Sequence, residues 1–205
     1  MTFPVDLTCA LTGATKGQLA SWRRPPNPLL APEGGRSPVL YSFRDVLALR
    51  TMVFLRSQVP LQRIRVAFES LGQMNLTDHP SRYKLTTDGS SIYLIDETGA
   101  TDLVKKPGQR VLADLEQIMR PFPNFRDEMV VDFVHPRDNL ELREGRMGGW
   151  PTILGTRIPY DTVARLQRGG PGVAVPPEEI ERFYPSVSVA AAIDAMSFDE
   201  QVRAA

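Results

Sequence analysis

The sequence has 205 residues, 42% of them hydrophobic, and its 24 basic and 24 acidic residues give a formal net charge of zero. This length allows one large domain or two to three small ones, and the hydrophobic content excludes a chain that is disordered throughout. There is neither a long apolar run nor a secretion signal at the start, so we expect no membrane span. The single cysteine, Cys9, fits a reducing cytoplasm, where we expect it to be buried.

The charges are unevenly distributed along the chain. Residues 1–75 contain nine basic and four acidic residues, a net charge of +5, whereas the remainder contains 15 basic and 20 acidic residues, a net charge of −5. A basic segment favours contact with a polyanion. We therefore expect a head over residues 1–75 that binds nucleic acid and a body that does not.

Two short helices joined by a tight turn are predicted first. Residues 6–11 carry apolar side chains on one side, and Gly13 supplies a turn conformation that other residues resist. The second helix covers residues 15–24, with Thr15 as its N-cap, and the Pro25-Pro26 pair ends it.

This second helix has an apolar side and a polar side. Leu19 and Trp22 lie three residues apart and are expected to pack inward. The remaining side chains are basic or form hydrogen bonds: Lys16, Gln18, Ser21, Arg23 and Arg24. A short helix with such a face fits the major groove of DNA. An ordinary solvated surface helix has the same pattern.

A hairpin and two longer helices follow. Residues 29–32 and 39–41 are strand-like and flank a Gly-rich tip that carries Arg36. Ser42 and Asp45 form a capping box for the next helix, and after a break at Pro60 a further helix extends to residue 73.

The order of these elements resembles the DNA-binding head of MerR-like winged-helix regulators over residues 5–72, through LTGAT, QLASW, LLAP, GGRSP and YSFRDVLALR. Ala20 and Ser21 stand where many relatives carry an arginine and an aromatic residue. The resemblance implies that residues 15–24, Thr15 included, enter the major groove. It also implies that three side chains hold phosphates: Arg36, Tyr41 and Arg44.

The middle, residues 76–135, is predicted to be a small β-rich connector or dimerisation region. A hairpin flanks the Asp88-Gly89 turn signal, residues 110–119 are expected to form a short helix, and residues 129–134 a strand. His79 and His135 are the only histidines, and we expect loop or core roles for them and no metal site.

The tail, residues 136–205, is predicted to contain a strand pair and three short helices, similar to a helix-turn-helix bundle. The helices are expected over residues 160–168, 177–183 and 189–202, the last capped by Ser188. The second helix is acidic, which disfavours phosphate contact. The fold class is therefore α+β, mainly α, with a winged head, a small mixed sheet and a helical tail.

The segment GGWPTILGTRIPYDTV, with a Tyr-Pro before the last helix, resembles a small bacterial domain family of initially unknown function that is often described as antitoxin-like. The match covers about residues 136–200. Within its Gly-Thr-Arg-Ile-Pro core, Arg157 is either an anchor for a phosphate or a partner, or a residue that satisfies turn carbonyls.

A MerR-like head joined to such a tail resembles the antitoxin of a VapBC-type toxin–antitoxin pair. The resemblance implies operator DNA and a PIN-domain ribonuclease toxin as partners, and partner contacts by Arg146, Arg157 or Arg203. We expect a homodimer without cofactor. The alternative is a stand-alone MerR-like regulator whose middle sheet binds a small effector. An enzyme is disfavoured, because no catalytic constellation accompanies the histidines.

Overall fold

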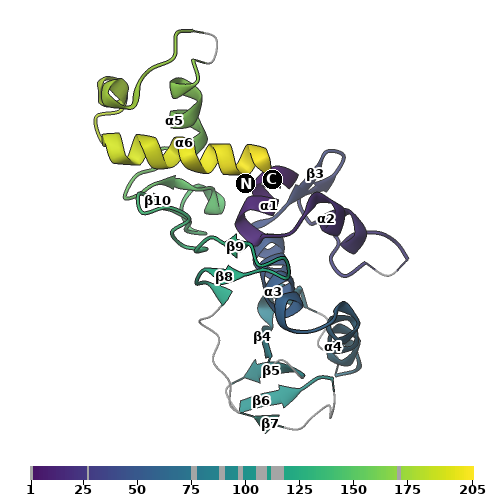
Figure 1. Cartoon of the computed structure of the whole chain (residues 1–205). Helices are drawn as coiled ribbons and strands as arrows, with labels where there is room; N and C mark the ends of the chain where they lie inside the picture. The colour runs from purple at the N-terminus through teal and green to yellow at the C-terminus, as the bar shows by residue number, and fades with distance from the viewer. Residues whose placement is uncertain are drawn as a thin grey trace.

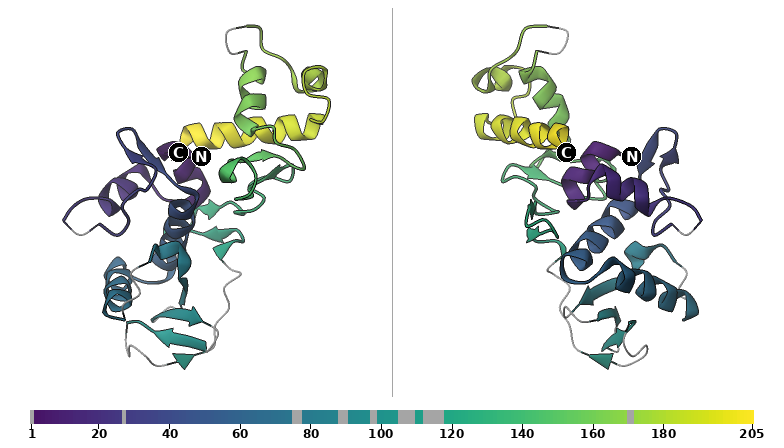
Figure 2. Two further views of the ribbon diagram at one scale, coloured as in Figure 1. Left: turned by 180° about the vertical axis from the view of Figure 1, so that it is seen from behind. Right: turned by 45° about the vertical axis from the view of Figure 1, so that its right-hand side comes forward.

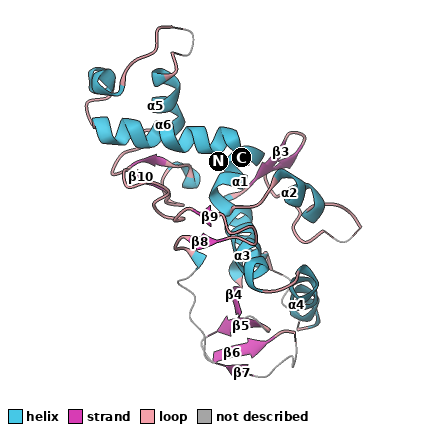
Figure 3. Cartoon of the chain, in the orientation of Figure 1, coloured by secondary structure: helices cyan, strands magenta, loops and turns pink. Residues whose placement is uncertain are grey.

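The structure is a computed structural model that describes residues 2–26, 28–74, 78–87, 91–96, 99–104, 110–111, 118–169 and 172–205. The fold is α+β (Figures 1 and 3). Its α-helices are α1 (Val5–Thr12), α2 (Lys16–Trp22), α3 (Phe43–Gln58), α4 (Leu61–Gln73), α5 (Tyr160–Gln167) and α6 (Val189–Ala204). Three 3-10 helices accompany them: η1 (Pro80–Arg82), η3 (Met147–Gly149) and η4 (Pro177–Arg182). None of these helices has the length and apolar character that a bilayer span requires.

The strands are short and antiparallel. They are β1 (Phe3–Pro4), β2 (Gly35–Arg36), β3 (Val39–Tyr41), β4 (Lys84–Thr87), β5 (Ile92–Asp96), β6 (Gly99–Asp102), β7 (Arg110–Val111), β8 (Phe122–Pro123), β9 (Met129–Val130), β10 (Leu140–Glu141) and β11 (Thr152–Ile153). They form sheets in the orders β1-β3-β2, β4-β5-β6-β7, β8-β9 and β10-β11.

The predicted pair of short helices is present as α1 and α2. Gly13 ends α1 in the left-handed region with φ 73°, and a Cβ there would lie 2.4 Å from Val130 Cγ2. Thr15 caps α2 as predicted, and Leu19 and Trp22 are both buried. The local sequence therefore predicted this turn correctly.

The hairpin after α2 is shorter than predicted. Its strands are β2 and β3, with Arg36 opposite Val39, and β1 adds a third strand through the Phe3 to Tyr41 pair. The predicted strand over residues 29–32 is wrong: the N–H groups of Leu29 and Leu30 instead donate to the Trp22 carbonyl at the end of α2. These groups satisfy the helix terminus, so they are not available to a sheet.

Helix α3 is the axis of the molecule (Figure 1). It begins with the predicted capping box of Ser42 and Asp45, and it is buried on several sides, because α1 and β8 pack against it as well as η1 and β4. Val59 ends it, as the predicted break requires, and α4 follows. A helix with partners on several sides buries more than one stripe of residues.

The four-stranded sheet lies beyond the far end of α3 (Figure 1). The predicted hairpin is present, with Leu85 opposite Leu94; the Asp88-Gly89 turn lies outside the described residues. The predicted helix over 110–119 is wrong at its start, because residues 110–111 are strand β7 on the edge of β6, while residues 112–117 are outside the described part.

The predicted strand over residues 129–134 is limited to β9. It stops because the Asp132 carboxylate accepts the N–H groups of Val134 (2.9 Å) and His135 (2.8 Å), closing a turn. A side chain that hydrogen-bonds its own backbone in this way competes with the sheet ladder.

The tail contains the predicted strand pair and helices, with one change of helix type. Strands β10 and β11 pair through Leu140 and Ile153, and Ser188 caps α6 by accepting the Ala191 N–H at 3.1 Å. The predicted helix over residues 177–183 is a 3-10 helix, η4, opened by prolines that lack the N–H for an α-helical ladder.

Head and tail share one hydrophobic core. The two chain ends lie side by side in all views, where α6 packs on α1 (Figures 1 and 2). Trp150 stacks on Phe3 with ring centroids 5.8 Å apart, and a Cβ at Gly149 would lie 2.1 Å from Phe43 Cδ2. The buried cluster runs from Phe3 to Val202 without a break between head and tail.

Candidate nucleic-acid and partner interfaces

Two of the predicted DNA-binding side chains serve the start of α2. Thr15 Oγ1 accepts the Gln18 N–H at 3.1 Å, and Gln18 Oε1 accepts the Thr15 N–H at 2.8 Å. This reciprocal pair fixes the first turn of the helix. Lys16 stands next to it with 56% of its side chain exposed, in an ion pair of 2.9 Å with Asp6.

The other end of α2 presents Ser21 and Arg24 to solvent, with Arg23 half-buried beside them. Arg23 Nη1 donates to the hydroxyl of Tyr41 at 3.3 Å, which ties α2 to β3. Arg23, Arg24 and Val39 line a hollow of about 460 Å³ between the end of α2 and the hairpin.

The structure places Tyr41 in the core instead of on the surface. It is 1% exposed, and burial raises the pKa of its hydroxyl. Because β3 is the central strand between β1 and β2, one of its faces packs on the core. We therefore assign to Tyr41 the role of positioning Arg23, in place of the predicted phosphate contact.

Two predicted phosphate ligands lie along the hairpin and the start of α3. Arg36 is in β2, and its side chain is outside what the structure describes. Arg44 is exposed, and its Nη2 lies 2.8 Å from Glu33 Oε1. Burial raises the pKa of Glu33, but the Ser42 hydroxyl, His79 and Arg44 outweigh it and lower that pKa.

Asp45 joins the hairpin, α3 and the connector. Its buried carboxylate accepts from the Glu33 N–H (2.9 Å), the Ser42 N–H (2.7 Å) and His79 Nε2 (3.0 Å). Glu33, Asp45 and His79 each offer a ligand atom within 4.8 Å of the others, the one such group of three among the described residues. Since hydrogen bonds within the protein already occupy these atoms, we assign the group a structural role.

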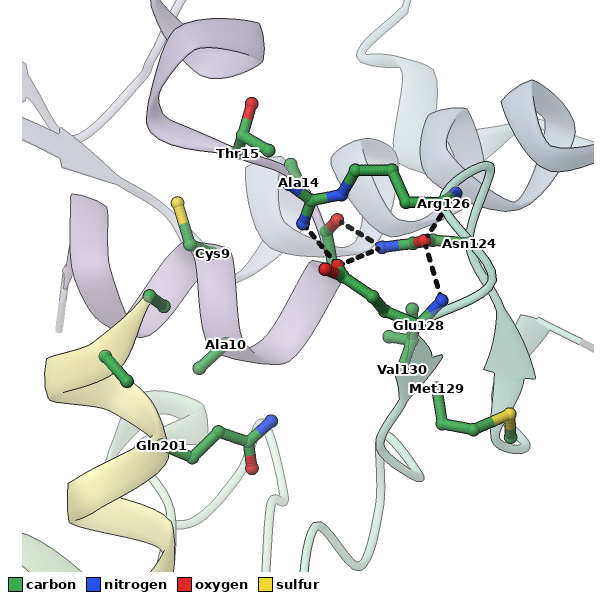
Figure 4. Close-up of a pocket in the computed structure, with 13 residues that line it drawn as sticks. Cys9, Ala10, Ala14, Thr15, Asn124, Arg126, Glu128, Met129, Val130 and Gln201 are labelled. Carbon is green, nitrogen blue, oxygen red and sulfur yellow. Dashed lines mark hydrogen bonds and ion pairs between the residues drawn. The ribbon is translucent and has the colours of Figure 1, made fainter.

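A hollow of about 400 Å³ lies beneath the N-terminus of α2, where α1, the β8–β9 hairpin and the end of α6 meet (Figure 4). Asn124 Nδ2 donates to the Gly13 carbonyl and to Glu128 Oε2, both at 3.2 Å, and Glu128 also pairs with Arg126. Cys9 lines the hollow, and burial raises the pKa of its thiol to about 11, which leaves it protonated near neutral pH.

In the tail, two of the three predicted partner-binding arginines lie together. Arg146 and Arg157 line a hollow of about 490 Å³ with Arg143. Arg203 is elsewhere: its Nε lies 2.6 Å from Asp199 on α6. The structure therefore replaces three scattered candidates by one cluster and one separate residue.

A buried carboxylate that the sequence analysis did not single out supports this cluster. Glu141 on β10 has no exposed side-chain area; it accepts the Gly155 N–H at 2.8 Å, pairs with Arg146, and has Arg143 Nε 2.6 Å from Oε2. The signal was weak, because Glu141 and Arg143 share one side of a strand, whereas Gly155 comes from the following turn.

Glu141 is expected to make the tail sensitive to acid. Burial raises its pKa, but the Gly155 N–H, Arg143 and Arg146 outweigh it and hold the pKa below the usual 4.5. A lowered carboxyl pKa stabilises the folded state above pH 4.5, and this contribution is lost as the pH falls through the folded-state pKa.

We therefore predict that Glu141→Gln unfolds at a lower temperature than the wild-type protein at pH 7 and that the gap narrows below pH 4.5. Thermal unfolding followed by circular dichroism from pH 7 to pH 3 measures this. Glu144→Gln, at an exposed neighbour, is the control and should show no gap. A gap that stays constant with pH would contradict the role given to the Glu141 charge.

Comparison with known proteins covers part of the tail. A family model described as "Protein of unknown function (DUF433)" matches residues 141–198. This segment begins at Glu141 and includes Arg143, Arg146 and Arg157. No curated protein and no solved structure matches the chain.

Proposed function

We propose that the chain is a DNA-binding antitoxin whose head binds operator DNA. The observation that carries this proposal is the capped helix α2, held through Arg23 and Tyr41 against the β1-β3-β2 sheet. Its exposed Lys16, Ser21 and Arg24 project from an otherwise buried root. A helix of this kind beside a hairpin suits a major groove and its flanking phosphates, as in a MerR-like winged helix-turn-helix.

The second half of the proposal concerns the tail. By its resemblance to antitoxin-like domains, the tail binds and neutralises a PIN-domain ribonuclease, with Arg146 and Arg157 in one contact and Arg203 in another. The net negative charge of the chain beyond residue 75 supports a protein partner for this half, because it disfavours an extended phosphate backbone. A homodimer in the cytoplasm would place two heads on two half-sites.

Removing two exposed cations of α2 tests the first half. In Lys16→Ala/Arg24→Ala, affinity for the protein's own promoter DNA should fall at least tenfold, while the thermal unfolding temperature stays unchanged, because both side chains are exposed. Each lost phosphate contact should also lower the slope of log affinity against log salt by about 0.9. Fluorescence anisotropy over a salt series measures both quantities.

The matched control is Arg182→Ala, an exposed arginine of the tail with a surface ion pair like that of Lys16. It should bind DNA as the wild-type protein does. Equal affinities for all three proteins, or no promoter binding at low salt, would refute DNA binding by α2.

Co-expression tests the second half. A small ribonuclease encoded in the adjacent reading frame should arrest growth when expressed alone, and the full chain should restore growth and co-purify with the ribonuclease. No rescue and no co-purification would refute the antitoxin role.

A second candidate function is a regulator that responds to a small effector. The hollow below α2 favours it, because Thr15 of the α2 cap and Gln201 of α6 line the same space (Figure 4). An occupant would contact the helix proposed to bind DNA. Promoter activity that depends on a small molecule, in the absence of any ribonuclease gene nearby, would favour this candidate.

A further inference from the structure

The three arginines of the tail hollow carry more positive charge than their surroundings neutralise. Six residues line the hollow: Arg143, Gly145, Arg146, Gly155, Thr156 and Arg157. The carboxylate that pairs with this group is Glu141, behind Arg143 and Arg146. Three guanidinium groups and one carboxylate leave a local charge of +2.

Most guanidinium N–H groups of this cluster are available to a ligand. Glu141 takes Nε of Arg143 and Nη1 of Arg146, which leaves the terminal nitrogens of Arg143 and the Nη2 of Arg146. Within the described part of the chain, Arg157 is exposed and has neither an ion pair nor a side-chain hydrogen bond. Guanidinium groups present their N–H donors as planar forks that match the oxygens of phosphate.

The backbone around the arginines keeps the hollow open and rigid. A Cβ at Gly145 or at Gly155 would meet no atom within 4 Å, so both glycines leave room beside the guanidinium groups. Gly155 has φ +75°, which favours glycine, and its N–H fixes Glu141 at 2.8 Å. The buried carboxylate thus holds two arginines in place before a ligand arrives.

We propose that the hollow formed by Arg143, Arg146 and Arg157 binds a phosphate group. A dianionic phosphate neutralises the local charge of +2 and accepts from several forks at once, whereas a single carboxylate leaves one positive charge over. The phosphate group belongs to a small phosphate compound or to a nucleic-acid backbone. This inference goes beyond the proposed function, since it requires neither the promoter nor the toxin.

Titration of the full chain with orthophosphate tests the proposal. Isothermal titration calorimetry at constant ionic strength in chloride should show one site per chain, with sulfate as competitor. Arg157→Ala and Arg143→Ala should each weaken phosphate at least tenfold with unchanged far-UV circular dichroism. Arg165→Ala is the control on the same domain, because its exposed side chain pairs with Asp161 outside the hollow.

A second titration identifies the source of the phosphate. If a short duplex of unrelated sequence binds and Arg157→Ala weakens it as much as it weakens orthophosphate, the hollow binds the backbone; if only orthophosphate responds, the ligand is a small phosphate. The proposal is overturned if orthophosphate does not bind, if Arg157→Ala binds it as the wild-type protein does, or if N-acetylglutamate binds in its place. None of these outcomes depends on operator binding by α2 or on toxin rescue.

Discussion

Replacing Arg50 with methionine is expected to lower the free energy of unfolding by about 3–5 kcal/mol, the cost of disrupting a buried charged network. Arg50 has no exposed surface in the middle of α3. Burial lowers the pKa of its guanidinium to about 10, so the group stays charged at neutral pH. Its N–H groups donate to five backbone carbonyls, those of Leu11, Ile118, Met119, Arg120 and Val131.

These carbonyls are the reason why an apolar substitute is not sufficient. Methionine fills much of the volume, but it leaves buried acceptors without a donor, at about 1–3 kcal/mol for each one that water cannot reach. Phe122 and Phe133 add a second constraint, because the guanidinium carbon lies 5.0 and 5.4 Å from their ring centroids. Arg50 thereby attaches the segment from Ile118 to Val131 to α1 and α3.

Thermal unfolding of the full chain measures the effect. For a chain of this size, the expected loss corresponds to a fall in unfolding temperature of roughly 6–20 °C. Arg50→Lys should be intermediate, because an ammonium has three donors. Arg56→Met, on the same helix but with a single long hydrogen bond of 3.4 Å, is the matched control and should shift little. Similar unfolding temperatures for Arg50→Met and Arg56→Met would show that the carbonyl contacts contribute nothing.

The role of Arg50 shows where sequence reasoning reached its limit. Thr15, Ser42 and Ser188 were identified as caps because each bonds within its own helix turn, a relation fixed by spacing along the chain. Arg50 was counted only as one of nine basic residues of the head. Its acceptors lie up to 81 positions away, and no local pattern indicates such a partner.

The candidate sites follow the same division. Leu19 and Trp22 were predicted to face inward, and they do, because helical spacing alone determines which side they share. The cluster of Arg143, Arg146 and Arg157 could not be predicted as a unit, since it depends on how the Gly155 turn approaches Glu141. Arg146 and Arg157 were named individually, whereas the residue that holds them together was not.

Asp45→Ala is expected to have the second largest effect, a loss of about 3 kcal/mol, because it leaves two buried N–H donors and a histidine without their acceptor. The Glu33 N–H lies before the β2–β3 hairpin and the Ser42 N–H directly after it. His79 connects the same carboxylate to η1 and the four-stranded sheet. Removal of one side chain therefore loosens both ends of the hairpin and its link to the connector.

The local nature of this loss makes it measurable apart from overall stability. Hydrogen exchange at the Glu33 and Ser42 amides should become faster in Asp45→Ala, while exchange in α6 follows the global change only. Asp45→Asn, which keeps one acceptor oxygen, should lose less. Asp6→Ala is the control, because Asp6 is also in the first turn of a helix but is 53% exposed.

If the hairpin flanks DNA as proposed, Asp45→Ala should also weaken promoter binding at a temperature where the variant remains folded, although Asp45 is buried and cannot contact DNA. The reason is that a loosened hairpin must be ordered again on binding, which reduces affinity. Unchanged exchange at Glu33 and Ser42 would show that the carboxylate does not hold the hairpin. Faster exchange with unchanged promoter affinity would show that the hairpin is held by Asp45 but takes no part in binding DNA.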